Sequence, residues 1–330
     1  MSLRSSVSGV VRPAVTPAPR AGDAALAGLR ILVGLLWLYN VAWKLPPDFG
    51  ESSGSGVYGF SRDAVEHPVF PPYSWVVEQL VLPNFTAFGW MVLVVETLLA
   101  VLLLTGTLVR VAALVGVGQS LAIGLSVAQT PGEWPWAYWM MIGIHVALLF
   151  TASGRVAAVD SVRAEATTGR GPTAAARLLR GWAVLVGAAG VVALALAVDD
   201  DLLASEGAQL GGPDFSISLG SYNVVGAGVL VAVAALMMLA ASLRQRALAL
   251  AATAVAVLAA LSVYVQLTRT EVWLGGSNTS AALFLCAAVV SGATAGLLTS
   301  TADAPERKWH GTARAARTGS DRRQGVRRQG

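Results

Sequence analysis

Long runs of apolar residues constrain this chain more than any other feature of its sequence. Eight runs approach the roughly 20 residues that an α-helix needs to cross a bilayer. These runs lack the alternation of barrel strands, and only helices and closed barrels satisfy their backbone polar groups in lipid. The sequence therefore predicts an all-α, polytopic integral membrane protein with eight transmembrane helices. The runs lie at 24–44, 84–105, 109–128, 136–152, 179–198, 223–243, 247–267 and 279–298.

Charged residues support this prediction and set an orientation. Only 13% of the chain is charged, against about 25% in soluble globular domains. With both termini inside, the inner segments hold 19 of the 23 Lys and Arg residues, and the outer loops hold three basic and twelve acidic residues. This distribution follows the positive-inside rule. We therefore predict a multi-pass protein of the cell membrane with both termini cytoplasmic.

Five regions follow from the distribution of polar and apolar segments. A basic linker separates the first four spans from the last four, which predicts two tandem four-helix bundles. Both bundles are expected to be embedded in the lipid bilayer. Cytoplasmic orientation and attraction to anionic lipid explain the basic tail, so no nucleic-acid partner is predicted. The regions are a disordered cytoplasmic leader at 1–22, a first bundle at 23–160, a basic cytoplasmic linker at 161–178, a second bundle at 179–300 and a basic, disordered cytoplasmic tail at 301–330.

The outer loop at 45–83 is unusually long. It contains the flexible sequence ESSGSG and the segment PPYSWVVEQLVLP, which starts on prolines and places Trp75, Val76, Gln79 and Leu80 at helical spacing. Proline is favoured in the first turn of a helix. We expect a short helix here that lies on the outer surface or covers the mouth of a cavity in the first bundle.

Glu96 is the only carboxylate inside any of the apolar runs. A carboxyl group in hydrocarbon is costly, so it is expected to face a partner, a cavity or a ligand. Glu96 lies about 18 Å along the second span from its outer end, and Arg30 lies about 21 Å along the first span from Lys44, at 1.5 Å per residue. These similar depths favour an Arg30–Glu96 ion pair.

His145 and Gln119 lie at comparable depth on the fourth and third spans. One interpretation is structural: the buried polar groups satisfy one another and fix the helix register. The other is a ligand pocket open to the outer leaflet, in which His145 and Glu96 exchange protons as catalytic residues. In that pocket, hydrogen-bond donors would come from the candidate ligand-binding residues Arg30, Tyr39, Asn40 and Gln119.

Metal and covalently bound cofactors find little support in the sequence. The three histidines, His67, His145 and His310, lie on an outer loop, in a span and in the tail, so a histidine-rich metal or haem site is not expected. The only cysteine, Cys286, lies in the last span. Because a dithiol relay needs two cysteines, the sequence excludes one. No metal ligand is assigned.

Four pieces of the first bundle resemble the DoxX family, including the DoxD-like subunits of thiosulfate:quinone oxidoreductase. They are LRILVGLLWLYNVAWKL, ETLLAVLLLTGTLVRVAAL, TPGEWPW and HVALLFTASGRVAAVD, and together they cover about two-fifths of the chain, at 24–160. The last four spans lie outside the resemblance. The residues on recurring positions of the family are Arg30, Lys44, Glu96, Arg110, Gly154, Arg155 and Asp160.

The resemblance implies a four-helix membrane bundle and, for the DoxD-like branch, a subunit of quinone-linked oxidation of sulfur compounds such as thiosulfate. Quinone would be the electron acceptor, and a soluble or membrane partner subunit would supply chemistry that this chain lacks. Two alternatives stay open. One is a non-catalytic scaffold that recruits a partner enzyme, and the other is a carrier for a small or lipophilic solute.

Overall fold

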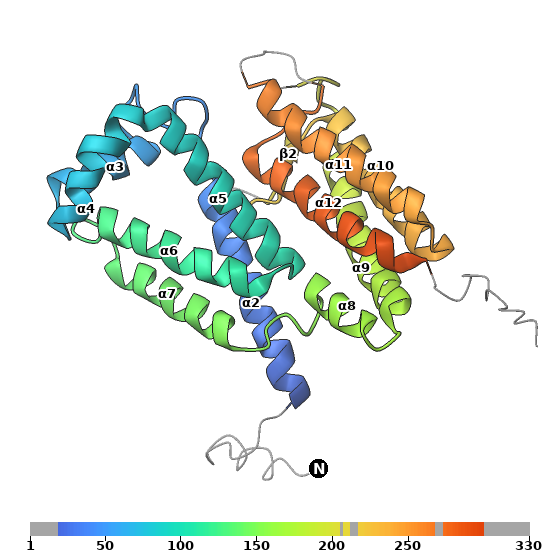
Figure 1. The fold of residues 1–330 in the computed structure, drawn as a ribbon. Helices are drawn as coiled ribbons and strands as arrows, with labels where there is room; N and C mark the ends of the chain where they lie inside the picture. Colours follow the sequence, from blue (N-terminus) through green and yellow to red (C-terminus); the bar gives the residue numbers. More distant parts are fainter. Residues whose placement is uncertain (1–18, 205–206, 212–216, 268–272, 300–330) are drawn as a thin grey trace, which may run out of the picture. The chain divides into compact units, whose positions relative to one another are not determined.

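The computed structural model describes residues 19–204, 207–211, 217–267 and 273–299, and their ribbon is almost entirely helical (Figure 1). The helices and strands in chain order are α2 Pro19–Ala42, α3 Gly56–Glu66, α4 Pro71–Val76, a π-helical turn Val77–Val81, a 3₁₀ turn Leu82–Asn84, α5 Phe85–Thr105, α6 Val109–Val127, α7 Pro135–Phe150, α8 Val159–Ala166, α9 Gly171–Leu196, β1 Ala208–Leu210, β2 Gly220–Tyr222, α10 Val224–Leu243, α11 Arg246–Val265 and α12 Asn278–Leu298.

Seven helical segments in the described part of the chain are long and apolar enough to cross a membrane, which confirms an all-helical, polytopic membrane protein. The run predicted at 136–152 corresponds to α7, which has 16 residues. At 1.5 Å per residue α7 is about 24 Å long, against about 30 Å for a hydrocarbon core. The seven segments are Arg20–Ala42, Pro71–Thr105, Val109–Val127, Gly171–Leu196, Val224–Leu243, Arg246–Val265 and Asn278–Leu298.

Two predicted boundaries differ from the structure. Most of the predicted linker at 161–178 is helical, because α8 occupies its first part and α9 begins at Gly171. The alanine-rich sequence after Pro172 favours helix and is continuous with the apolar run. Of the predicted leader, residues 19–22 belong to α2, and 1–18 lie outside the described residues, as does the predicted tail at 301–330.

The long loop at 45–83 contains α3 and α4, and the helical prediction for PPYSWVVEQLVLP is confirmed. The helix continues through the π and 3₁₀ turns into α5. The Tyr73 hydroxyl of α4 lies 3.1 Å from the Ala122 carbonyl and 2.9 Å from the Ser126 hydroxyl of α6. These contacts attach α4 to α6. A short antiparallel hairpin of β1 and β2 precedes α10 and was not predicted.

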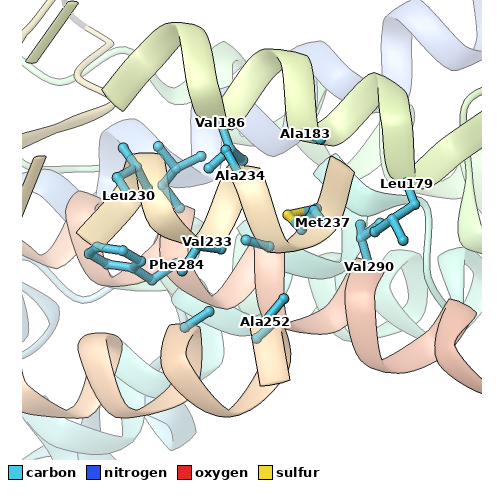
Figure 2. Close-up of a cluster of buried hydrophobic side chains, with 14 of the residues drawn as sticks. Leu179, Ala183, Val186, Leu230, Val233, Ala234, Met237, Ala252, Phe284 and Val290 are labelled. Atoms are coloured by element: carbon cyan, nitrogen blue, oxygen red, sulfur yellow. The ribbon is translucent and has the colours of Figure 1, made fainter. Parts of the chain in front are cut away.

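The second helix set, α9 to α12, has an apolar core. Neighbouring helices pack in the order α9, α10, α11, α12, and α12 also packs against α9. Figure 2 shows Leu230, Val233 and Met237 of α10 directed between α9 and the helices that carry Ala252 and Phe284. Many core residues are alanines, which let helix backbones approach closely. The core is therefore close-packed without charged residues.

The first helix set comprises α2, α5, α6 and α7, with contacts between α2 and α5, α5 and α6, and α6 and α7. α12 packs against α2 and α5 as well as against its own set, and Cys286 and Ala282 of α12 belong to the apolar core around Trp37 and Leu99. α12 thus joins the two sets. We call the end of the helices where α5 ends and α8 lies the α8 end, and the opposite end, where α3 packs on Phe85, the α3 end.

Candidate functional site

Glu96, halfway along α5, forms a buried cluster with Gln119 and with Lys44, which follows the end of α2. The Lys44 ammonium lies 2.5 Å from Oε2 of Glu96, and Gln119 donates to Oε1 at 3.0 Å. The Lys44 and Glu96 side chains are only 2% and 1% exposed. Lys44 also donates to the Asn40 carbonyl at 2.8 Å and lies 3.9 Å from the centre of the Trp43 ring. Both charges are therefore paired and shielded from solvent.

Lys44 follows the last residue of α2 by two positions, so it lies outside the membrane-spanning helix. Burial lowers the pKa of its ammonium, and the neighbouring carboxylate of Glu96 opposes this shift. The ammonium thus depends on Glu96 to remain charged, because a buried cation without a partner is costly.

The predicted Arg30–Glu96 ion pair is wrong. The depth estimate placed the outer ends of α2 and α5 at the same level, but α5 extends well past the end of α2 at the α3 end. The contacts fix the offset: Arg30 reaches the last turn of α5, and Lys44, beyond the end of α2, reaches Glu96. Twelve residues of helix, about 18 Å, separate Arg30 from the end of α2 at Ala42, and Lys44 lies beyond that end.

Arg30 instead binds backbone carbonyls at the α8 end. One guanidinium nitrogen donates to Leu103 at 2.9 Å, and another donates to Val156 at 3.2 Å and Ala157 at 3.0 Å. The carbonyls at a helix C-terminus lack intrahelical partners and attract cations. Gly106 ends α5 with φ of 66°, and a Cβ there would lie 2.1 Å from the guanidinium. Arg30 therefore closes the end of α5 against the segment before α8.

Asp160 binds the N-terminus of α6, next to Gly106 at the end of α5. Its two carboxylate oxygens each accept a backbone N–H at 3.0 Å, from Leu108 and Val109. Its own N–H donates to the Gly106 carbonyl at 3.0 Å. A carboxylate at a helix N-terminus is favourable because it accepts from free N–H groups and complements the helix dipole. Asp160 thus holds α8 to the α5–α6 turn.

His145 is completely buried and both of its ring nitrogens are engaged. Trp37 donates its indole N–H to Nε2 at 3.0 Å, and Nδ1 lies 2.7 Å from the Met141 carbonyl. These contacts require the proton on Nδ1 and leave Nε2 as an acceptor. A Cβ on Gly116 would lie 2.1 Å from the imidazole, so only glycine gives the ring its space. His145 lines neither of the two cavities described below.

The remaining predicted ligand-binding residues do not join Glu96 through their side chains. Tyr39 is 43% exposed on α2, and the Asn40 amide donates to the Leu36 carbonyl of its own helix at 3.1 Å. Of the predicted site residues, only Gln119 contacts Glu96. Glu96 and His145 thus lie in two separate buried groups.

An apolar cavity of about 790 Å³ lies elsewhere, between α2, α8, α9 and α12. Its charged and hydroxyl-bearing residues, Arg155, Ser161, Glu165 and Arg177, gather at the α8 end and form what we call the mouth. The six predicted site residues do not line it. Its wall includes Leu35, Leu38, Trp182, Leu185, Ala282 and Cys286.

A second, polar cavity of about 480 Å³, which we call the basin, adjoins the first. Arg155, Ser161 and Glu165 line both, and Arg110 and Asp23 also line the basin. Glu165 of α8 pairs with Arg177 of α9 at 3.2 Å across the mouth. The sequence offered no signal for either cavity, because each is lined by segments that are far apart in the chain.

Asp63, Glu66 and His67 of the α3 region place one potential metal-ligand atom each within 4.8 Å of one another. They follow the i, i+3, i+4 spacing of neighbours on a helix face. Glu66 is already paired with Arg62, and both side chains are about half exposed. The cluster is an ordinary solvated helix face.

No protein-family model, curated protein or solved structure matches this chain.

Proposed function

We propose that this chain is a membrane subunit of quinone-linked redox metabolism that resembles DoxX proteins in its first four spans. One observation carries the proposal: the large apolar cavity with a charged mouth. Ligand sites of about 300–1,000 Å³ with apolar walls and a few polar groups are typical of small-molecule binding. An isoprenoid quinone suits this site because it combines a long apolar tail with a ring whose two carbonyl oxygens accept hydrogen bonds.

In this proposal eight helices cross the cell membrane as two tandem four-helix bundles, with both termini in the cytoplasm. α7 is short, and a locally thinner bilayer accommodates such a helix at modest cost. The α8 end is the cytoplasmic end, because Arg110, Arg155, Arg163, Arg170 and Arg177 lie on its loops and adjoining helix ends.

The proposal assigns different tasks to the two groups of polar residues. Glu96 and His145, with their hydrogen bonds already made, hold the first helix set together. The mouth residues contact the ligand. The electrons come from the substrate or from a partner subunit, and the DoxD-like resemblance favours a sulfur compound such as thiosulfate as the donor.

Gly181 offers a direct test because it lines the cavity, and a Cβ there meets no atom within 4 Å. Gly181→Phe should fill the cavity without disturbing the helix packing. In membranes that contain the protein, we expect thiosulfate-dependent quinone reduction to be lost in this variant. Gly228→Phe is the matched control, because Gly228 is a helical glycine with the same free space outside the cavity. Equal quinone reduction by both variants would contradict the proposal.

A non-catalytic scaffold is the second candidate, favoured by the closed hydrogen bonding of Glu96 and His145. A scaffold predicts that Gly181→Phe leaves partner-dependent activity unchanged, whereas deletion of residues 300–330 prevents recovery of the partner enzyme. A carrier would instead give solute uptake into proteoliposomes with no electron acceptor present. These outcomes separate the three functions.

A further inference from the structure

We infer that the quinone lies with its ring at the mouth and its tail along the cavity toward Cys286, so that the ring is reached from the basin and the aqueous phase at the α8 end. This inference rests on the function proposed above. It adds the orientation of the ligand and the side of the membrane from which its ring is accessible.

Hydrogen-bond donors are concentrated at the mouth. Arg155 and Arg177 are about 70% exposed and carry guanidinium groups that donate to carbonyl oxygens. Ser161 lines both cavities, and its hydroxyl group donates to the Ala158 carbonyl at 2.6 Å, so the two guanidinium groups are the donors assigned to the ring. A quinone ring placed here exchanges hydrogen bonds with water for hydrogen bonds with protein.

The opposite end of the cavity is apolar. Leu38, Ala282 and Cys286 line it, and a thiol is the strongest donor among these three side chains. About 18 Å of helix separates Cys286 from Leu298 at the α8 end of α12. A ring at this depth would leave its carbonyl oxygens without hydrogen-bond partners, which is unfavourable for buried polar groups. The deep end therefore favours the tail.

Cavity length also fits this orientation. The lining residues of α9 extend from Ala174 to Leu185. That stretch of helix covers about 16 Å, close to half of the roughly 30 Å hydrocarbon core. A ligand that enters from the leaflet at the α8 end can thus keep its polar group level with that leaflet's surface while its tail follows α9.

The basin gives the mouth a polar neighbour. Because Arg155, Ser161 and Glu165 line both cavities, a ring at the mouth borders the basin directly. Asp23, Arg110 and Asp160 also line the basin, and Asp23 lies 3.8 Å from the Arg155 guanidinium. We therefore place the aqueous access to the ring, and the docking position of a water-soluble electron donor, at the α8 end.

Cys286 is the only cysteine of the chain, so its alkylation reports on the deep end of the cavity. The experiment measures the rate of N-ethylmaleimide labelling in purified protein with two fully substituted quinones that do not add thiols. Duroquinone has no tail, and the second compound is a trimethylbenzoquinone with a decyl tail. At about ten times its Kd a bound ligand leaves about one site in eleven free, so protection should slow labelling about tenfold.

We expect the decyl compound to protect Cys286 and duroquinone to leave its labelling rate unchanged. In a Cys286→Ser background, Ser161→Cys reports on the mouth, and both compounds should protect it. Gly181→Cys, in the middle of the wall, replaces Cys286 as the depth probe if the native thiol resists labelling. Gly228→Cys lies outside the cavity and should be labelled equally in all conditions.

Protection of the deep thiol by duroquinone, with the mouth thiol left reactive, would overturn the orientation while leaving the proposed function intact. Protection of none of the cysteines by either compound would instead contradict quinone binding itself. Recovery of a tightly bound phospholipid, with no effect of quinone on labelling, would give the cavity a different occupant and overturn both.

Discussion

At the scale of single residues, each buried charge of the first helix set has its own partner. Lys44 and Glu96 pair with each other, and Arg30 binds the Leu103 carbonyl in the last turn of α5 and two carbonyls of the segment before α8. Asp160 of α8, which is only partly buried, binds two N–H groups at the start of α6. Each group therefore stabilises a different junction, and loss of a partner of Lys44, Glu96 or Arg30 should leave a buried charge unpaired.

Lys44→Met should destabilise the protein by about 3–5 kcal/mol, because it leaves the Glu96 carboxylate buried without its cation. Glu96→Met should cost a similar amount for the converse reason. The double variant should lose clearly less than the sum, since apolar side chains replace both charges. The measurement is the free energy of unfolding in mixed micelles. Additive losses would show that the two side chains do not interact.

Gly106→Ala should lower the free energy of unfolding by more than about 1 kcal/mol, because Gly106 has φ of 66° and its Cβ would overlap the Arg30 guanidinium. Gly118→Ala is the control. Gly118 lies within α6, and a Cβ there meets no atom within 4 Å, so this change should be neutral or stabilising. Equal effects of the two substitutions would refute the close approach of Arg30 to α5.

At the scale of helices, α12 is the element that joins the two sets. Its Ser277–Ser280 capping box fixes where it begins, and the Asn278 amide then donates to the carbonyls of Val41 and Lys44 at the end of α2. Tyr264 of the neighbouring helix α11 makes an edge-to-face contact with Trp90 of α5. The α3 end of α2 is thus held by a helix of the second set.

Asn278→Ala should cost about 1–3 kcal/mol, because it removes the donor shared by two buried carbonyl groups. Thermal unfolding in detergent, followed by tryptophan fluorescence, would report this as a lower midpoint. Asn84→Ala removes an exposed amide that bonds only within its own helical segment, and it should have little effect. A midpoint for Asn278→Ala that matches the wild type would mean that α12 does not anchor α2.

Sequence periodicity and run length predicted the long apolar helices and the proline-initiated segment before α5, but not α3 and α8, which are short and less apolar. They could not predict the relative heights of helices, because the ends of apolar runs are not fixed at one membrane level. That error placed Arg30 beside Glu96 instead of Lys44. The cavity was equally inaccessible to sequence reasoning, since Leu35, Trp182 and Cys286 come from three distant helices and none has an unusual local pattern.

At the scale of the whole molecule, the large cavity lies between the two helix sets. The first set carries the buried charges and the second set carries none within its helices, yet both contribute walls to the large cavity. A binding site in this cavity requires both helix sets to be folded and packed together. The second set therefore supplies part of the proposed binding site.

Quinone retention tests this account most directly. After purification in mild detergent, wild-type protein and Gly228→Phe should each release quinone in near-equal amount to protein on solvent extraction, and Gly181→Phe should release at least tenfold less. Absence of quinone from the wild type, or equal retention by Gly181→Phe, would contradict the assignment of the cavity as the quinone site.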